Sequence, residues 1–411
     1  MNFPRKFLHI DEKYINGDTT IVLVDDTITC LQRLAKYKRD LYDIPVVAVT
    51  GSVGKTSVKD IIYSVISSKY NVLCTKGNLN NHLGVPLTIL ELRDHDALIL
   101  EMGMNHAGEL HTLSNIANPT ISVITNIGID HTEFLGDTLP QIAAEKAGII
   151  KLNVPCVVGE MQEETFPIFE ERARACEIWG EGPETTDCRI WFANQCGFMR
   201  KRRLKEASQC QLVGDYQQNN LQTAFVALQA LRNVCGIPLS VQSIAEGFAQ
   251  VCDLTGLRGR WETLSLQPLT ICDTGHNSHG IRYVAKQLCQ LLANQTGLPD
   301  SSLQTPTLRI VLGMVGDKDI DVVLSVLPEQ AVYYFTQPTT SRAFSAQQLQ
   351  AKWQALHPTH TDNQSFTSAS EALTAAKKDA SSKDIIFIGG SNYVVGEVLS
   401  STHYSRTIHA Q

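Results

Sequence analysis

A short apolar run that ends in a glycine turn constrains the fold of this chain more than any other feature. Residues 46–49 read Val-Val-Ala-Val, which predicts a buried strand, and Gly51-Ser-Val-Gly54 breaks that strand. A helical pattern then begins at Lys55, and its apolar face comprises Val58, Ile61, Ile62, Val65 and Ile66. The sequence therefore predicts a strand, a tight turn and a helix in direct succession.

This succession is typical of a phosphate cradle, in which turn N–H groups and a helix N-terminus attract anions. Lys55 is expected to reach terminal phosphates, and Thr56 is expected to hold Mg²⁺. Val49 stands where the full P-loop pattern has its first glycine, so a plain strand-to-helix turn is the competing interpretation. We predict a nucleotide site formed by Gly51, Ser52, Gly54, Lys55, Thr56 and Ser57.

Composition and charge narrow the class of protein. The chain has 411 residues, too many for one ordinary core, so two or three domains are expected. Its net charge of −7 argues against general nucleic-acid affinity, and no apolar run approaches transmembrane length. Residues 1–14 lack the apolar core of a signal peptide, and the eleven cysteines include no C-x-x-C pair. We therefore expect a cytoplasmic protein with reduced cysteines that binds neither nucleic acid nor membranes.

Strand-like and helix-like patterns alternate from residue 44 onward. Helical spans separate the apolar runs at 97–100, 121–125, 154–158, 269–272, 310–312, 332–335 and 385–388. That alternation indicates parallel sheets covered by helices. The segment 179–210 has mixed polarity, and we interpret it as a small antiparallel excursion. Helices are expected at 219–234 and 241–248.

The same pattern divides the chain into three regions of an α/β fold. Residues 1–43 are too few for a complete domain; a strand at 19–24 and a helix at 28–39 are expected there, with Leu31, Leu34 and Ala35 facing inward. Residues 44–255 are predicted to form a nucleotide domain around a P-loop-type parallel sheet. A hinge at 254–260 leads into a smaller Rossmann-like α/β domain, residues 256–411.

Polar residues cluster where predicted strands end, which is where ligands collect in α/β sheets. Glu101 ends one strand and is suited to Mg²⁺; a carboxylate bonded to a loop is the alternative. Asn126 and Asp130-His131 follow the next strand, and His131 is a candidate metal ligand, although a single histidine is more often structural. Lys146 is either a surface lysine or, near bound metals, an amine that takes up CO₂ to form an anionic carbamate.

A second group of polar residues lies around the hinge. Gln217 and Asn220 offer amides that could pair with a base edge, and N-capping explains one such amide but not several. Arg260 could clamp a phosphate once the domains close, with a surface ion pair as the competing interpretation. A further strand ends in a glycine turn that carries Asp273, His276 and Asn277. This placement is expected if a nucleotide binds between the domains.

With these motifs, the chain resembles the Mur ligase superfamily of ATP-dependent enzymes, which join a carboxylate to an amine, over about residues 44–411. Up to about residue 131 it looks like the muramoyl-tripeptide D-alanyl-D-alanine ligase, through Thr50-Gly-Ser-Val-Gly-Lys-Thr56 and the segments 77–86 and 101–109. From about residue 126 onward it is similar to folylpolyglutamate synthase/dihydrofolate synthase, through Asp273-Thr-Gly-His-Asn277 and the segments 126–139, 144–150, 256–261, 313–319 and 389–393.

The resemblance implies a role for each candidate residue. ATP would phosphorylate an acceptor carboxylate, and an amino group would then attack the acyl phosphate. Gly51 to Thr56 would hold the phosphates of ATP, with Asn126 beside them. Two Mg²⁺ ions are implied, one held by Thr56 and Glu101 and one by His131 and a carbamylated Lys146. The remaining roles implied are adenine contact for Gln217 and Asn220, γ-phosphate contact for Arg260, ribose contact for Asp273, and closure of the crevice for His276 and Asn277.

The two halves of the resemblance imply different substrates. In this superfamily the C-terminal domain largely handles the incoming amino acid, so the folate-like half favours addition of L-glutamate to a folate. The 43 leading residues cannot supply a whole UDP-sugar-binding domain, which favours the same substrates. The alternative is joining of a UDP-muramoyl peptide to a dipeptide. Two alternative functions outside the ligase class are a nucleotide-driven switch and a non-catalytic fusion of two related proteins. We expect a monomer acting on small molecules.

Overall fold

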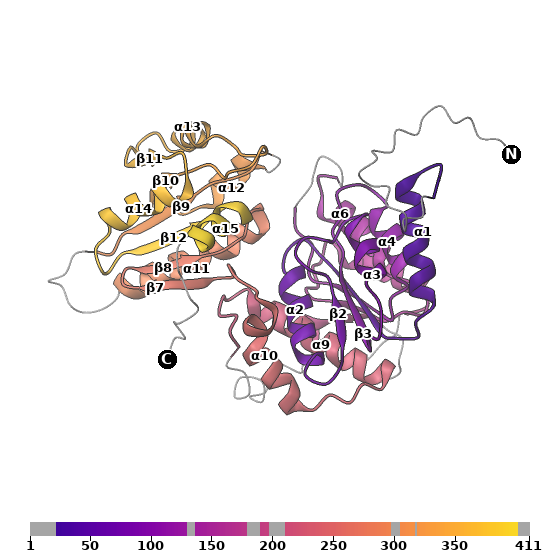
Figure 1. Ribbon diagram of the computed structural model, residues 1–411. Coiled ribbons are helices and arrows are strands. Elements are labelled where there is room, and N and C mark those ends of the chain that lie inside the picture. Colours follow the sequence, from indigo (N-terminus) through magenta and orange to yellow (C-terminus); the bar gives the residue numbers. More distant parts are fainter. Residues whose placement is uncertain are drawn as a thin grey trace, which may run out of the picture.

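Two six-stranded sheets, each covered by helices, organise the computed structural model of this protein (Figure 1). The structure describes residues 22–129, 136–178, 190–196, 210–296, 305–316 and 319–401. We call the part built around β1–β6 the first lobe and the part built around β7–β12 the second lobe. The strand order is β2-β3-β1-β4-β5-β6 in the first lobe and β11-β10-β9-β12-β8-β7 in the second.

All strand pairs of the first sheet are parallel. Its strands are β1 (Val46–Thr50), β2 (Val72–Cys74), β3 (Ala97–Glu101), β4 (Ile121–Ile124), β5 (Cys156–Val158) and β6 (Ile190–Phe192). Every residue of β1, β3 and β4 is buried, as expected for apolar strands covered on both faces. Because β1, β3 and β4 are parallel neighbours, their carboxyl ends meet at one edge of the sheet.

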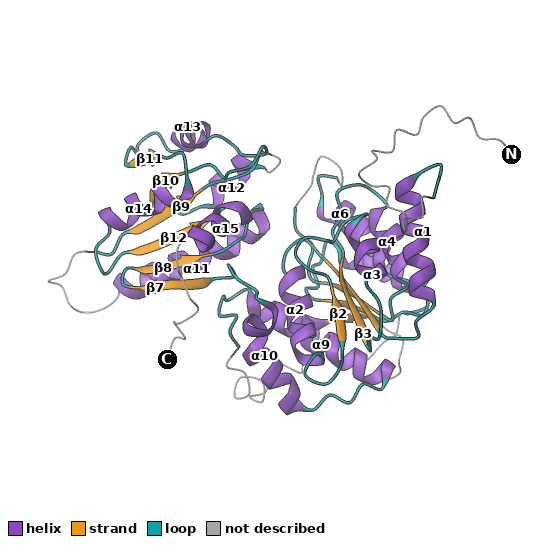
Figure 2. Ribbon diagram, viewed as in Figure 1, coloured by secondary structure: helices purple, strands orange, loops and turns teal. Residues whose placement is uncertain are grey.

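Helices cover both faces of this sheet (Figure 2). One face carries α1 (Thr27–Asp40), α3 (Gly84–Leu90), α4 (Glu109–Ala117), α6 (Leu139–Lys146) and α7 (Phe166–Ala175). The other carries α2 (Lys55–Ile66), α9 (Gln217–Cys235) and α10 (Val241–Thr255), and the short 3₁₀ turns are η3 (Ala147–Ile149) and η4 (Ala193–Gln195). Each large aliphatic side chain buried here contributes roughly 1.5–3 kcal/mol.

The second sheet is parallel except for its edge strand β7, which pairs antiparallel with β8. Its strands are β7 (Glu262–Leu266), β8 (Leu269–Cys272), β9 (Leu308–Leu312), β10 (Val332–Phe335), β11 (Asn363–Ser365) and β12 (Ile385–Gly389). Its helices are α11 (Ser278–Thr296), α12 (Ile320–Val326), α13 (Ala346–Leu356), α14 (Ala369–Asp379) and α15 (Asn392–Ser401). The largest buried side chain, Trp353, packs on Tyr333 with 4.0 Å between ring centroids.

Helix α1 belongs to the packing of the first lobe. It packs against α3 and α4 (Figure 1), and Ala35 is fully buried. The buried Arg39 fixes the end of the helix, since its Nε donates to the Ala117 carbonyl oxygen at 2.9 Å and its Nη1 to the Tyr42 carbonyl oxygen at 2.6 Å. The sequence before residue 44 therefore supplies a helix that completes one face of the first sheet.

Four local predictions differ from the structure. Residues 22–24 of the expected strand 19–24 form no strand, and the rest of that segment lies outside the described residues. Leu34 is 52% exposed rather than inward-facing. The described part of segment 179–210 contains β6, which extends the sheet in parallel with β5 and so is not an antiparallel excursion. Helix α10 also runs to Thr255, beyond the expected end at residue 248.

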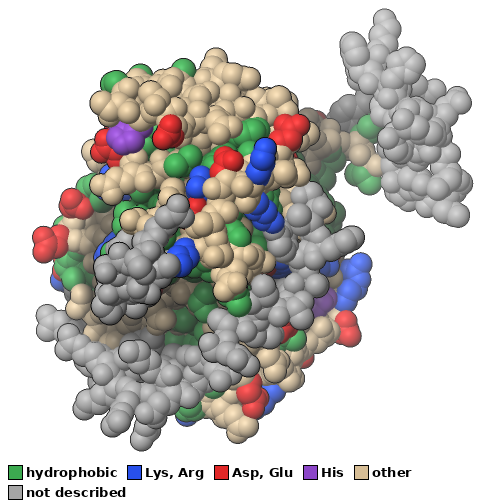
Figure 3. Space-filling model, turned by 90° about the vertical axis from the view of Figure 1, so that its left-hand side faces the viewer, with side chains coloured by type: hydrophobic (Ala, Val, Ile, Leu, Met, Phe, Trp, Pro, Cys, Tyr) green, Lys and Arg blue, Asp and Glu red, His purple; other side chains and the backbone are tan. Residues whose placement is uncertain are grey.

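Two observations concern the partners expected for this chain, one on membrane spans and one on surface charge. In the described part of the chain, no helix combines the length and apolar character of a membrane span. Figure 3 views the second lobe, where described acidic and basic side chains are interspersed on the visible face.

Gly159, directly after β5, gives a test of how tightly the strand ends pack. A Cβ atom there would lie 2.1 Å from the Thr125 carbonyl oxygen and 2.4 Å from Thr223 Oγ1. We expect Gly159→Ala to lower the free energy of unfolding by about 3 kcal/mol, measured by urea denaturation. Gly396→Ala is the matched control, because a Cβ there meets nothing within 4 Å; it should leave stability equal or slightly raised. Equal stability of both variants would contradict this packing.

Candidate active site

A cavity of about 560 Å³ lies between the two lobes. The first lobe contributes Gly51, Ser52, Gly54, Lys55, Thr56, Ser57, Glu101 and Lys146 to its wall. The second lobe and the hinge contribute Arg260, Asp273, His276 and Asn277. Twelve of the residues proposed from the sequence therefore meet around one space, although long stretches of chain separate them.

The turn between β1 and α2 depends on its glycines. Gly51 and Gly54 have φ angles of +145° and +83°, which residues with a side chain rarely adopt. A Cβ atom on Gly51 would lie 1.9 Å from Thr125 Oγ1, and one on Gly54 would lie 2.2 Å from Asn220 Oδ1. The backbone of this turn can therefore approach both neighbouring segments only because no side chain intervenes.

The segment after β4 fixes the shape of this turn. Ser52 N–H donates to the Asn126 carbonyl oxygen at 3.1 Å, and Val53 N–H donates to Asn126 Oδ1 at 3.0 Å. Ser52 Oγ donates to the Gly128 carbonyl oxygen at 2.9 Å and accepts from Gly128 N–H at 2.8 Å. Asn126 is buried and is not part of the cavity wall, so the structure gives it contacts that hold the turn in place.

Gln217 and Asn220 lie behind the glycine turn. Both are buried in the first turn of α9, and Asn220 Nδ2 donates to Gln217 Oε1 at 2.7 Å. Neither side chain lines the cavity described above. The expected adenine contact of these amides stays a prediction. In the structure Asn220 packs against Gly54, and Gln217 holds Asn220 through their hydrogen bond.

Positive charge reaches the cavity from both lobes. Lys55 Nζ donates to the carbonyl oxygens of Gly51 at 2.8 Å and Ser52 at 3.3 Å, so it lies folded over the turn. Arg260 lines the facing wall, and its Nη1 donates to the Gly259 carbonyl oxygen at 3.3 Å. Lys146, at the end of α6, is only 4% exposed and also lines the cavity, so it is not a surface lysine. With Arg342, which also lines the cavity, four cationic residues surround this space and favour an anionic ligand.

Glu101 has the contacts expected of a metal ligand. It is buried at the end of β3, and its Oε1 accepts from Asn80 Nδ2 at 2.8 Å. Its Oε2 is buried and accepts no hydrogen bond from any residue that the structure describes. A buried carboxylate oxygen without a donor is costly, and a cation would compensate it. Carboxylate and hydroxyl oxygens suit Mg²⁺, so Glu101 and Thr56 fit the ion that the sequence predicts.

The structure describes only one of the two residues expected to bind the second ion. His131, with Asp130, lies outside the described residues, so Lys146 is the only member of that pair whose position the structure gives. Its burial at the cavity wall is compatible with the predicted carbamate, which stays a prediction.

Asp273 connects the hinge, the first lobe and β8. It is 3% exposed and accepts hydrogen bonds from the Tyr216 hydroxyl, from Trp261 N–H at 2.7 Å and from Gly275 N–H at 2.7 Å. Burial raises the pKa of the Asp273 carboxyl, and the Tyr216 hydrogen bond opposes that rise. These contacts position the two lobes around the cavity. The ribose contact expected of Asp273 stays a prediction.

His276 and Asn277 shape the start of α11. The His276 ring Nδ1 lies 2.9 Å from the Thr274 carbonyl oxygen, and Asn277 Oδ1 accepts from Gly280 N–H at 2.8 Å. Both residues also line the cavity. Each of these side chains therefore makes a local structural contact and also lies where it can contact a ligand in the cavity.

Two residues of this site, Asn80 and Tyr216, are not predicted from the sequence. Asn80 orients Glu101, and Tyr216 bonds Asp273 across the lobes. Asn80 lies in the segment 77–86, which carries the resemblance, and Tyr216 directly precedes Gln217. Their partners are distant in sequence, so spacing alone gives no reason to assign them a function.

The Glu101 carboxylate provides a prediction about metal binding. Glu101→Gln keeps an oxygen that can accept from Asn80 but removes the negative charge, so we expect Mn²⁺ binding to weaken at least tenfold. Titration followed by electron paramagnetic resonance measures this directly. Glu91→Gln, on an exposed carboxylate paired with Lys76, is the control and should bind Mn²⁺ as the native protein does. Equal affinity in Glu101→Gln and native protein would remove Glu101 from the metal site.

Comparison with known proteins identifies both halves of the chain. The Mur ligase middle domain matches residues 49–228, and the Mur ligase glutamate ligase domain matches residues 259–392. UDP-N-acetylmuramoyl-tripeptide–D-alanyl-D-alanine ligase of Bacillus subtilis is 49% identical over 117 residues, which are 28% of this chain and 26% of that protein. Dihydrofolate synthase/folylpolyglutamate synthase of Escherichia coli is 29% identical over 310 residues, 74% of this chain and 64% of that protein. The chain thus matches less than two thirds of either relative.

A solved structure shares the fold over nearly the whole length. It is a bifunctional folylpolyglutamate synthase/dihydrofolate synthase from Yersinia pestis, complexed with AMPPNP and a manganese ion. The TM-score is 0.70 at 20% identity, and the match covers 95% of this chain and 96% of that chain. The predicted α/β fold is confirmed, with a parallel sheet in the first lobe and a second, mixed sheet after it.

Proposed function

Because this chain belongs to the Mur ligase family through both its middle and its C-terminal domains, we propose that it is an ATP-dependent ligase that joins a carboxylate to an amino group. The observation that carries this proposal is the cavity between the lobes, with a glycine turn on one wall and Arg260 on the other. The orphaned oxygen of Glu101 adds a place for the cation that accompanies ATP.

The proposed reaction has two steps. A substrate carboxylate oxygen attacks the γ-phosphorus of ATP, which gives an acyl phosphate and releases ADP. An amine then attacks the acyl carbon, the amide bond forms, and phosphate and a proton leave. Such chemistry needs mainly positioning and stabilisation of negative charge. Lys55 and Arg260 would stabilise the phosphates from opposite walls of the cavity.

A bound divalent cation would neutralise phosphate charge in this site. Thr56 and Glu101 would hold one such ion, and His131 with Lys146 would hold another. The amides of Asn126, Gln217 and Asn220 support the turn that faces the phosphates. Asp273 links the second lobe to Tyr216 of the first lobe, and His276 and Asn277 shape the turn before α11 at the facing wall.

For the substrates, we propose a folate and L-glutamate. The match to dihydrofolate synthase/folylpolyglutamate synthase extends over 74% of the chain. The muramoyl ligase match has higher identity but covers only 28% of the chain, so a UDP-muramoyl peptide with D-alanyl-D-alanine is the alternative. The higher identity is the specific observation that keeps this alternative under test.

A paired phosphate-release assay tests the proposal. Purified protein with Mg²⁺ and ATP receives either tetrahydrofolate and L-glutamate or UDP-muramoyl-tripeptide and D-alanyl-D-alanine, and each single substrate serves as a control. We expect phosphate release with the first complete pair and a folate product heavier by one glutamate. Release only with the second pair would reverse the order of substrates. Release without any acceptor would indicate a nucleotide switch, and no release with any combination would indicate a non-catalytic protein.

A further inference from the structure

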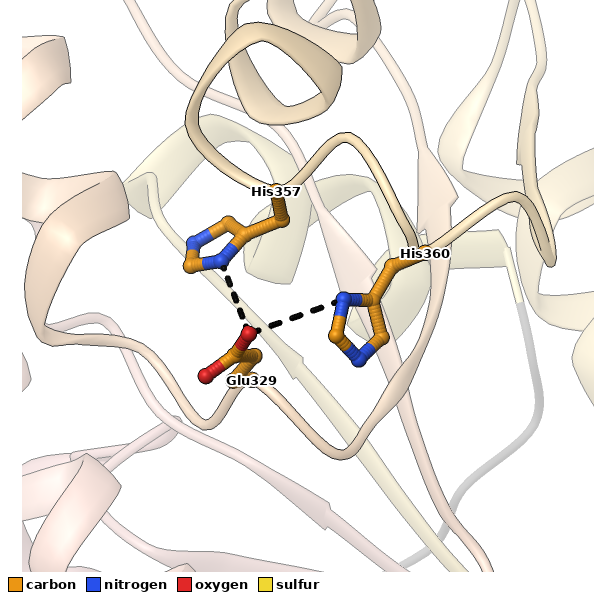
Figure 4. A group of neighbouring side chains, drawn as sticks. All are labelled: Glu329, His357 and His360. Atoms are coloured by element: carbon orange, nitrogen blue, oxygen red, sulfur yellow. Dashed lines mark ion pairs between the residues drawn. The ribbon is translucent and has the colours of Figure 1, made fainter.

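Two histidines and a glutamate of the second lobe converge on one another (Figure 4). Glu329 lies between α12 and β10, His357 directly follows α13, and His360 precedes β11. Glu329 precedes the amino end of β10, and both histidines precede the amino end of β11, which is parallel to β10. Asp273, in contrast, follows the carboxyl end of β8. The cluster is therefore separate from the candidate active site.

The distances in this cluster suit a metal ion better than hydrogen bonds. Glu329 Oε1 lies 3.4 Å from His357 Nδ1 and 3.7 Å from His360 Nδ1, and the three ligand atoms all lie within 4.8 Å of one another. A charge-assisted N–H···O hydrogen bond is shorter, about 2.7–2.9 Å. Bonds of about 2.1 Å around a tetrahedral zinc ion place neighbouring ligand atoms about 3.4 Å apart.

The surrounding contacts hold the His357 imidazole and the backbone of the turn that carries His360, and His360 Nδ1 also lies 3.4 Å from Thr359 Oγ1. The His357 ring packs on Trp353 with 4.1 Å between ring centroids, and its side chain is 17% exposed. The turn between the histidines is closed by a hydrogen bond from His360 N–H to the His357 carbonyl oxygen at 3.1 Å. Asn363 Nδ2 donates to the His360 carbonyl oxygen at 2.8 Å, and Gln350 Nε2 donates to Asn363 Oδ1 at 2.8 Å. The two Nδ1 atoms thus reach Glu329 from a turn that is itself fixed.

We propose that Glu329, His357 and His360 bind a divalent transition-metal ion such as Zn²⁺, through two Nδ1 atoms and a carboxylate oxygen. Imidazole with carboxylate is a donor set for zinc-like ions, whereas Mg²⁺ prefers oxygen ligands alone. Glu329 is 58% exposed, so an ion enters from solvent and water completes the coordination. Among the described residues, this is the one group of three His, Cys, Asp or Glu side chains arranged for a shared ion.

Metal binding at this cluster would tie the end of α13 to the loop before β10. Because an ion that binds only the folded state stabilises it, Zn²⁺ should raise the melting temperature of the protein. The reaction in the cavity needs none of these residues. Loss of the zinc site would therefore leave the proposed ligase activity in place, so the two proposals fail independently.

The decisive experiment titrates Zn²⁺ into chelator-treated full-length protein by calorimetry, with excess Mg²⁺ present to occupy the oxygen-ligand site. His360→Gln is the main variant, because that side chain is 36% exposed and its loss disturbs little packing. Glu329→Gln is the second variant, and His111→Gln, on an exposed histidine outside the cluster, is the control. His357→Gln is less suitable because it also removes the contact with Trp353.

We expect one Zn²⁺ per native protein and per His111→Gln protein, with a higher melting temperature on binding. In His360→Gln and Glu329→Gln, affinity should fall at least tenfold and the thermal shift should disappear. Substitution by Co²⁺ should give the visible absorption of a tetrahedral site in native protein and in His111→Gln, but not in His360→Gln or Glu329→Gln. Zinc affinity equal in native protein and both cluster variants would overturn the proposal, and so would the absence of a cluster-dependent thermal shift.

Discussion

Lys55→Ala should lower kcat roughly a thousandfold, the loss typical for removal of a group that stabilises transition-state charge. Lys55 opens α2 beside the glycine turn, and its ammonium group lies over that turn, where phosphates would bind. Alanine removes the charge but leaves the backbone N–H groups of the turn. Phosphate release with both substrates present measures the effect.

Lys69→Ala provides the control for Lys55→Ala. Lys69 is exposed, follows the same helix and does not line the cavity, so its removal should leave kcat within twofold of the native value. Thermal unfolding of both variants checks that neither change acts through stability. If Lys55→Ala turned over at the native rate, the glycine turn would be a structural feature rather than a phosphate site.

Lys146→Ala should lower kcat at least a hundredfold, and a small carboxylate such as acetate should restore part of it. The expected carbamate forms when the lysine amine adds to CO₂ and a proton leaves, which turns a cationic side chain into an anionic oxygen donor. The burial of Lys146 at the cavity wall makes this position suitable for a ligand. Acetate can replace the missing oxygen donor in the space that alanine leaves.

Rescue by acetate distinguishes a carbamate from a simple lysine. Lys55→Ala is the control here, because its lost group is a cation and acetate should give no recovery. Activity of Lys146→Ala that responds to added methylamine but not to acetate would show that the lysine acts as an amine, contrary to the carbamate prediction.

The parts of the fold with strong local signals were predictable from sequence. The apolar run of β1, the glycine turn and the periodic face of α2 are local patterns, and the structure has them where the sequence places them. The β6 prediction failed for a nonlocal reason, since three residues can pair in either direction and the neighbour β5 decides which. Leu34 is exposed because α1 packs through Ala35 and Arg39 instead.

The residues of the candidate site also divide into those that a local sequence signal could identify and those whose contacts depend on the packing of distant segments. Polar residues at strand ends, such as Glu101 and Asp273, could be proposed from position alone, and the parallel sheets bring them to one cavity. Asn220 could not be placed in this way, because its contact with Gly54 depends on how α9 packs beneath the turn. The Glu329 cluster is equally nonlocal, since its glutamate and its histidines come from different loops.

The central claim is that one nucleotide is held by both lobes. Calorimetric titration with a nonhydrolysable ATP analogue and Mg²⁺ tests it most directly when applied to Arg260→Ala. Arg282→Ala, on the exposed side of α11, is the matched control because it does not line the cavity. We predict at least tenfold weaker binding for Arg260→Ala and native affinity for Arg282→Ala. Native affinity in Arg260→Ala would show that the second lobe does not hold the nucleotide and would contradict this account.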